Sequence, residues 1–266
     1  MNLNYKTYIG SDCKRNYEES VNFIIDSIED ENKYIDKYIK LFEEGSCKHT
    51  TLLGISHRHL KFASLALLKD SDVKKFKQEI YLSAKLYIMY NYWDRTIPSY
   101  LGWKIFLSDS PELIEYVKSN ISYFIKQYEK YTASGMPYGG FLLYHILLAL
   151  NDDWEKLEKS VITLLESNRK NQIRYIPDHK FFLAMCKKDT QGMEEALNML
   201  LAPKLARKRM YSLGVYFDFY LNVIVLTYAK IATLKGFDLN IDHPTIFNCC
   251  HVLFGDRKST RLNSSH

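Results

Sequence analysis

Apolar residues recur at every third or fourth position along most of the chain, which is the spacing of one face of an α-helix. The segments that carry this helical spacing cover residues 17–28, 34–42, 49–69, 73–93, 111–131, 141–165, 180–201 and 216–234. No segment shows a sustained alternation of apolar and polar residues, so the sequence predicts no β-sheet. We therefore expect an all-α fold.

Residues with known preferences for helix ends mark several of these boundaries. Gly45 is placed to end the second helix, and either Ser71 or Asp72 is placed to cap the fourth. Ser110 followed by Pro111 is a typical helix start, with a hydroxyl cap and a proline at the first helical position. Further breaks are predicted at Pro98, Gly102, the loop 135–140 and Gly236.

A helical hairpin occurs twice in the second half of the chain, at 141–165 and at about 180–201, with a constant offset (189 − 153 = 36). The matching positions are Leu147, Leu150, Asp153, Leu157, Glu158, Val161, Leu164 and Leu165 in the first copy and Leu183, Cys186, Asp189, Met193, Glu194, Leu197, Leu200 and Leu201 in the second. This length is close to the ~34-residue period of tetratricopeptide repeats. We expect stacked antiparallel hairpins, with a tetratricopeptide-like C-terminal half of the kind that binds macromolecules.

The chain is expected to form one all-α domain over residues 1–255. The N-terminal helices would occupy 15–131, and the repeated hairpins with the closing helices would occupy 137–254. The last segment, 256–266, is polar, carries no apolar stripe and resembles translated vector sequence. We expect this tail to be non-native, which leaves open whether the native C-terminus is truncated.

Composition narrows the class of protein only slightly. The apolar fraction of 47% and the charged fraction of 25% are ordinary for a folded protein. A net charge of +5 is mild for 266 residues, so we expect no nucleic-acid partner. The 21 tyrosines reflect either codon bias in an AT-rich genome or a tyrosine-rich binding surface.

The sequence predicts a cytoplasmic protein. Five cysteines are an odd number, and their spacing matches no zinc motif, so reduced thiols are expected. The first 20 residues lack the apolar core of a signal peptide. No apolar run reaches the ~18 residues that a transmembrane helix needs, so we also expect no membrane partner.

Few residues offer catalytic chemistry. His57 and His59 lie two positions apart, which places them on different faces of a helix and argues against a shared metal ion. His145 lies in an apolar helix, where we expect a hydrogen-bonded core residue. Asp178 precedes His179 at a predicted helix start, where an acidic side chain favours the positive end of the helix dipole. With no recognisable nucleophile motif, we expect no catalytic residue, no metal site and no cofactor.

Two segments resemble the Immunity protein 49 family. Residues 178–209, DHKFFLAMCKKDTQGMEEALNMLLAPKLARKR, contain an aspartate before an aromatic-rich helix, an Asp/Gly turn and a Met-containing helix. Residues 226–244, LTYAKIATLKGFDLNIDHP, resemble the closing helix, glycine and proline of that family. The resemblance covers residues 139–244 well and the N-terminal half loosely. The family continues beyond the proline, whereas this chain soon reaches the 256–266 tail.

The resemblance implies an all-α protein that protects a bacterium by binding a cognate toxin of an interbacterial competition system. It implies a function by association rather than turnover, and it carries over no catalytic or metal-ligating residue. The sequence leaves the toxin and the oligomeric state open. Our candidates for toxin contact are aromatic and charged residues near predicted breaks and helix ends: Trp93, Asp94, Arg95, Tyr138, Asp178, His179, Tyr216 and Asp218.

Two other functions are compatible with the same patterns. One is a tetratricopeptide-like adaptor or regulator that binds an extended peptide in a groove. The other is an all-α enzyme that uses His145, or Asp178 with His179. The enzyme hypothesis requires those side chains to converge on one accessible pocket.

Overall fold

The computed structural model describes residues 17–46, 48–94, 101–132, 140–167, 170–202, 204–206 and 221–241. Within these residues all regular secondary structure is helical, which confirms the predicted all-α class. The N-terminal helices are α1 (Tyr17–Asn32), α2 (Ile35–Glu43), α3 (Lys48–Leu68), α4 (Val73–Asp94), α5 (Leu101–Leu107), α6 (Pro111–Ser119) and α7 (Ile121–Thr132). The C-terminal helices are α8 (Gly140–Leu150), α9 (Trp154–Glu166), the short 3₁₀ helix η1 (Lys170–Tyr175), α10 (Ile176–Cys186), α11 (Thr190–Leu201) and α13 (Val223–Leu234).

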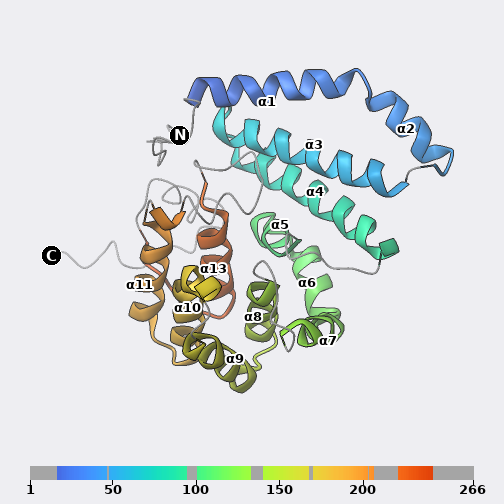
Figure 1. Cartoon of the computed structure of the whole chain (residues 1–266). Helices are drawn as coiled ribbons and strands as arrows, with labels where there is room; N and C mark the ends of the chain where they lie inside the picture. Colours follow the sequence, from blue (N-terminus) through green and yellow to red (C-terminus); the bar gives the residue numbers. More distant parts are fainter. Residues whose placement is uncertain are drawn as a thin grey trace.

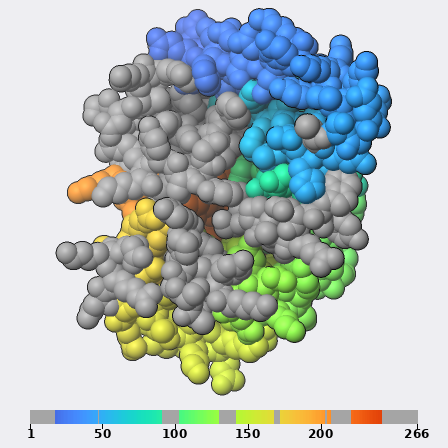
Figure 2. All heavy atoms as spheres, turned by 45° about the vertical axis from the view of Figure 1, so that its right-hand side comes forward, coloured from blue at the N-terminus to red at the C-terminus, as the bar shows by residue number. Residues whose placement is uncertain are grey.

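The helices lie in layers that follow the order of the chain (Figure 1). The pair α1 and α2 covers one end of the molecule and packs on α3. The long helices α3 and α4 pack against each other, and α4 also contacts α5. At the opposite end lie α8 to α11, and α13 contacts α5, α8 and α11. Figure 2 shows the same order from another side, with α1 and α2 at the top in blue.

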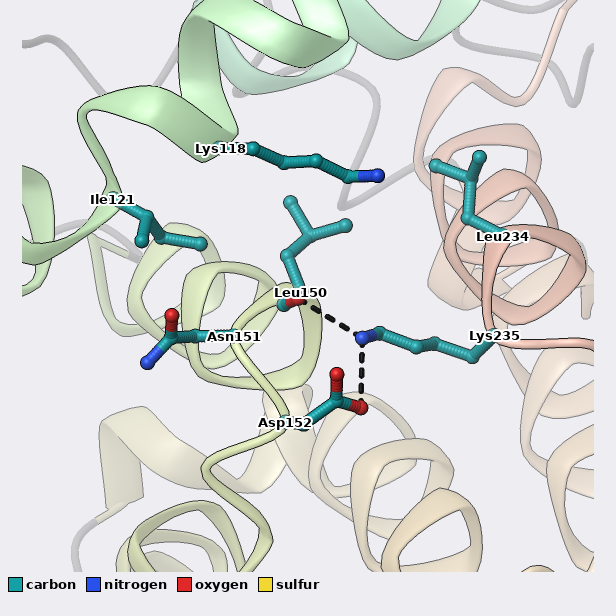
Figure 3. A pocket seen from close by; sticks show the side chains of 7 residues that line it. All are labelled: Lys118, Ile121, Leu150, Asn151, Asp152, Leu234 and Lys235. Carbon is teal, nitrogen blue, oxygen red and sulfur yellow. Dashed lines mark hydrogen bonds and ion pairs between the residues drawn. The ribbon is translucent and has the colours of Figure 1, made fainter.

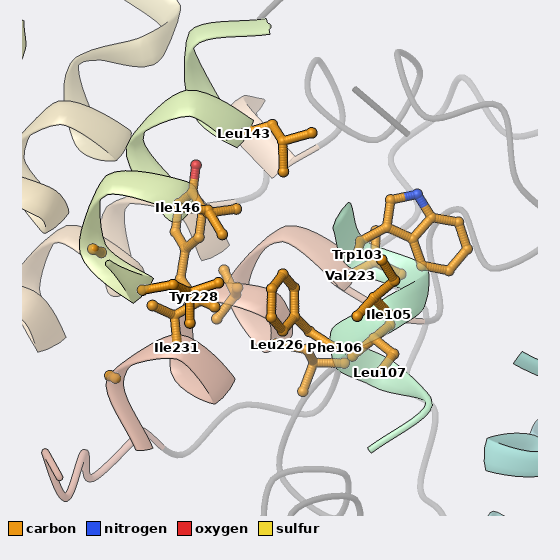
Figure 4. Packing of buried hydrophobic residues seen from close by; sticks show 14 of the residues in the cluster. Trp103, Ile105, Phe106, Leu107, Leu143, Ile146, Val223, Leu226, Tyr228 and Ile231 are labelled. Carbon is orange, nitrogen blue, oxygen red and sulfur yellow. The ribbon is translucent and has the colours of Figure 1, made fainter. Parts of the chain in front are cut away.

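The centre of the molecule is an apolar contact between α5, α8 and α13 (Figure 4). Phe106 and Leu107 of α5 and Leu226 and Ile231 of α13 are all almost completely buried. Nearly every residue of α13 up to Ala232 is buried, which agrees with the apolar character of this segment on most of its faces. Buried aliphatic and aromatic side chains of this kind each stabilise the fold by roughly 1.5–3 kcal/mol.

Several predicted helix ends are confirmed. Ser110 caps α6 by accepting a hydrogen bond from the Leu113 N–H, and Pro111 is the first residue of that helix. At the start of α4 the cap is Asp72, whose Oδ1 accepts from the Lys75 N–H at 2.9 Å. Gly45 and Gly236 follow α2 and α13, and both have a positive φ, the conformation that glycine adopts without steric cost.

The predicted helix 111–131 is wrong in its continuity, because the structure divides it into α6 and α7. Asn120 ends α6, and its side-chain amide donates to the Tyr116 carbonyl at 2.9 Å. That bond offers the carbonyl a partner other than the backbone N–H of the next helical turn. Helix α5 also lies where only a break was predicted, because it begins at Leu101, three residues after Pro98, and includes Gly102.

The two hairpin turns have the same backbone conformation. Asp152 and Lys188, which are 36 positions apart, have φ values of 58° and 56°. In the first turn the Asp153 N–H donates to the Leu148 carbonyl at 3.0 Å, and in the second the Asp189 N–H makes the equivalent bond at 2.9 Å. This pattern is a Schellman-type helix end, and it recurs at the spacing that the sequence repeat predicts. The wider tetratricopeptide-like stack stays a prediction.

Asp109 joins helices that are distant in sequence. It lies in the turn between α5 and α6, with a φ of 55°. Its Oδ2 accepts a hydrogen bond from Lys77 of α4 at 2.8 Å, and its Oδ1 accepts one from Lys230 of α13. One carboxylate therefore connects the N-terminal and C-terminal halves of the described chain.

Lys104 of α5 is a buried lysine in an aromatic environment. Its Nζ lies 4.2 Å from the centre of the Tyr87 ring and donates to the Ser56 hydroxyl at 3.3 Å. Burial lowers the pKa of Lys104 to about 7, because the ammonium form has lost most of its hydration.

Candidate functional site

Six of the eight predicted contact residues cannot be placed by their side chains. Helix α4 includes the backbone of Trp93 and Asp94, whose side chains lie outside the described part of the structure. Arg95, Tyr138 and the pair Tyr216 and Asp218 lie outside the described residues altogether. Their role in binding stays a prediction.

The remaining two, Asp178 and His179, lie in the core and are 0% exposed, which corrects their assignment as surface contacts. Asp178 Oδ1 accepts a hydrogen bond of 2.6 Å from the Tyr228 hydroxyl. His179 Nε2 lies 3.3 Å from Gln172 Oε1. The carboxylate that the sequence places at a helix start therefore also bonds across to α13, and a partner protein cannot reach either side chain in this fold.

His145 belongs to the same buried polar cluster. Its ring lies 5.8 Å from the His179 ring between centroids, and its Nε2 lies 3.0 Å from the Ser160 hydroxyl oxygen. Burial, together with the neighbouring His179, lowers the pKa of His145 well below its ordinary value, so the imidazole is neutral at pH 7. His145 is also 0% exposed, which confirms the expected core role.

Aromatic rings enclose this polar cluster. The Phe181 ring stacks on the Tyr228 ring at 4.9 Å between centroids, and Phe182 meets the same tyrosine edge-on at 5.1 Å. Phe182 also contacts His145. The three residues that an enzyme hypothesis would use therefore converge, but inside a packed core that no substrate reaches in this structure.

His57 and His59 do not form a metal site. His59 Nδ1 lies 2.7 Å from Glu79 Oε2, a bond that ties α3 to α4. Loss of hydration is the main cause of the lowered pKa of His57, and the charge of Lys104 adds to it. In the part of the chain that the structure describes, no three His, Cys, Asp or Glu side chains are grouped so that they could hold a metal ion.

An open pocket of about 320 Å³ lies beside the first hairpin turn (Figure 3). Its polar centre is Lys235, whose Nζ donates to the Leu150 carbonyl at 2.9 Å and pairs with Asp152 at 2.8 Å. The negative end of the α8 dipole also stabilises an ammonium group that lies beside the last carbonyls of that helix. Lys235 thereby fixes α13 to the turn, and its charge is already balanced there, so we assign this pocket a structural role.

A second, more exposed depression of about 330 Å³ lies on α1 and α2. It is lined by Phe23, Asp26, Ser27, Asp30, Glu31, Tyr34 and Tyr38. Phe23, Tyr34 and Tyr38 are 42%, 55% and 47% exposed, and the adjacent Ile39 is 43% exposed. Ten large apolar side chains are exposed among the described residues. Four of these ten lie on α1, on α2 or in the turn between the two helices. We call this region the α1–α2 groove, and it is the strongest candidate for an interaction site.

Sequence reasoning missed the α1–α2 groove. The apolar residues at 34, 35, 38, 39 and 42 form one stripe in the sequence, and such a stripe normally faces the core. In the structure α2 has no buried residue at all. The available signal was the amphipathic pattern of a nine-residue helix that contains Tyr38 and directly follows Tyr34.

The described fold defines an all-α protein with a surface groove and a sealed polar core. None of its described helices is both long and apolar enough to cross a membrane. Comparisons with protein-family models, with curated proteins and with solved structures each found no match.

Proposed function

We propose that this protein is a cytoplasmic immunity protein that binds and neutralises a cognate antibacterial toxin. The observation that carries the proposal is the α1–α2 groove, where aromatic side chains stay exposed on folded helices. Exposed aromatic residues of this kind are typical of protein–protein contact sites. The choice of a toxin as the partner rests on the resemblance of residues 139–244 to the Immunity protein 49 family.

The buried polar cluster supports a binding function over a catalytic role for its own three residues. His145, Asp178 and His179 are each fully buried and bonded within the core. A catalytic base has to approach its substrate within hydrogen-bond distance, and these side chains are 0% exposed. Their arrangement fits a protein that acts through its surface.

A tetratricopeptide-like adaptor is the second candidate. The repeated turns at Asp152 and Lys188 favour it, because repeated helix pairs commonly present a groove for an extended peptide. The adaptor hypothesis predicts affinity for short unfolded peptides. The immunity hypothesis predicts affinity for a folded toxin domain.

Co-expression in a bacterium tests the proposed function. The protein encoded by the adjacent gene is expressed alone and together with this one, and growth is scored. We expect growth arrest with the neighbour alone and restored growth with both proteins, together with a complex that co-purifies. A toxic neighbour that stays toxic, and that forms no complex with a folded, expressed protein, would contradict the proposal.

A further inference from the structure

The α1–α2 groove lies in the most acidic part of the described chain. Residues 17–44 contain nine acidic and three basic side chains, a net charge of −6. The whole chain has a net charge of +5, so the charge of this end is opposite to that of the protein as a whole. Such segregation produces a local negative potential that attracts a basic partner.

Carboxylates and aromatic rings both line the groove. Asp26 and Asp30 lie one helical turn apart on α1, and Tyr34 and Tyr38 follow one turn apart at the junction with α2. Asp30 also pairs with Lys33 at 2.8 Å, which leaves the side chain of Asp26 as an exposed carboxylate on this rim. A partner that presents an apolar side chain flanked by lysine or arginine would match both features.

Helix α1, which forms one side of the groove, is held on α3 by contacts on another of its faces. Val21, Ile24 and Ile28 of α1 form a small apolar cluster with Leu68 of α3. On the same side Glu31 pairs with Lys61 and, at 3.7 Å, with Arg58. Of the residues that line the groove, Ser27 and Glu31 also contact Lys61 and help to hold α1 in place. Asp26 and Tyr34 belong neither to this apolar cluster nor to these contacts, so they can be altered without removing the support of α1.

We propose that the α1–α2 groove is the surface that binds the toxin, and that it receives a basic segment carrying one aromatic or aliphatic anchor side chain. This inference rests on the proposed function for the identity of the partner, while the chemistry of the surface is independent of it. The anchor enters between Phe23, Tyr34 and Tyr38, and its flanking cations face Asp26 and Asp30. Binding of this kind weakens as salt screens the charges.

Two groove variants and two matched controls test the assignment. Asp26→Lys reverses a charge at the rim, and Tyr34→Ala removes an exposed ring. Glu115→Lys on α6 makes the same charge change elsewhere, and Tyr123→Ala on α7 removes a ring that is 50% exposed. We expect each groove variant to lower the affinity for the adjacent-gene toxin at least about tenfold, with the controls within about twofold of the wild type. Circular dichroism and urea unfolding verify that all four variants fold.

A synthetic probe makes the result independent of the toxin. One peptide has a single tryptophan surrounded by lysines, and a second has glutamates in place of the lysines. By fluorescence anisotropy we expect the basic peptide to bind the wild type and both controls, and to bind Asp26→Lys and Tyr34→Ala at least about tenfold more weakly. The acidic peptide should not bind.

The two assays separate the failure of each proposal. If the toxin binds the wild type and both groove variants equally well, the groove is not its binding surface, and the further inference is wrong while the immunity function stands. If no toxin binds but the basic peptide distinguishes the groove variants, the function is wrong and the surface chemistry stands. Equal binding of the basic peptide to the wild type and all variants would overturn the assignment of the groove as a site for basic segments.

Discussion

The side-chain amino group of Lys104 is buried, and burial favours its neutral form over its charged form. The pKa of about 7 in the folded state lies below the ordinary value of 10.5, so the folded protein releases this proton before the unfolded chain does. Below pH 7 both states hold the proton, and the folded state bears the whole cost of a buried charge. Between pH 7 and 10.5 that cost declines, so this group makes the protein more stable as the pH rises.

Lys104→Met removes the cost and keeps most of the side-chain volume. We expect the variant to be more stable than the wild type by roughly 3 kcal/mol at pH 6, with a much smaller difference at pH 9.5. Urea unfolding at the two pH values measures this difference. An equal difference at both pH values would show that the gain comes from packing and not from the buried charge.

Helix ends show how similar local structures depend on different contacts. Asp152 and Lys188 both adopt the left-handed conformation, which costs non-glycine residues about 1 kcal/mol. We expect Lys188→Gly to raise the free energy of unfolding by about 0.5 kcal/mol, because glycine relieves that cost but is more flexible when unfolded.

Asp152→Gly is the matched comparison, because it relieves the same strain and also removes the ion pair with Lys235. Its net effect is therefore expected to be smaller than that of Lys188→Gly, or negative. Urea unfolding midpoints measure both effects. A gain as large as that of Lys188→Gly would mean that the pair between α13 and the turn contributes nothing.

Elements that depend on local sequence were predictable, and elements that depend on competition between contacts were not. The helical stripes, the glycine ends and the Ser110 cap follow from periodicity and backbone chemistry within a few residues. Asn120 breaks a stripe that is otherwise continuous, and it does so through one side-chain bond to Tyr116. Nothing in the spacing of apolar residues reveals whether one continuous helix or the pair α6 and α7 is more stable.

The candidate site was harder to predict than the fold. Asp178 and His179 look like surface residues in sequence because charged and polar side chains usually are. Their burial depends on Tyr228, which lies 50 positions away from Asp178. The exposure of Tyr34 and Tyr38 likewise depends on how completely α3 covers α2, which is a property of packing between helices.

In the molecule as a whole, Asp109 links helices from both halves. Asp109→Ala removes the carboxylate that pairs with Lys77 and with the buried Lys230. We expect a loss of roughly 3 kcal/mol in the free energy of unfolding, because the buried side chain of Lys230 loses this carboxylate partner. Chemical unfolding followed by circular dichroism measures the loss.

The exposed pair of Lys85 and Glu112 provides the control. Glu112→Gln should leave the free energy of unfolding almost unchanged, because solvent screens the charges of an exposed pair. If Asp109→Ala and Glu112→Gln were equally mild, the link between α4 and α13 would not contribute to the stability of the fold.

The small cluster beneath α1 has a consequence for how the molecule moves. Its buried members Val21, Ile24, Ile28 and Leu68 are distinct from the main core, so α3 faces one cluster on each side. A unit held by so few side chains opens at a lower free energy than the centre, and its amide protons exchange with solvent through that local opening. A ligand that binds only the closed form raises the free energy of opening. At concentrations well above the Kd, the increase grows with the logarithm of the ratio of ligand concentration to Kd. Occupation of the groove would therefore slow hydrogen exchange in α1 and α2. It would slow exchange by the same factor in any helix that opens only by global unfolding, because the groove is lost there too, and it would leave unchanged only those openings in which α1 and α2 stay closed.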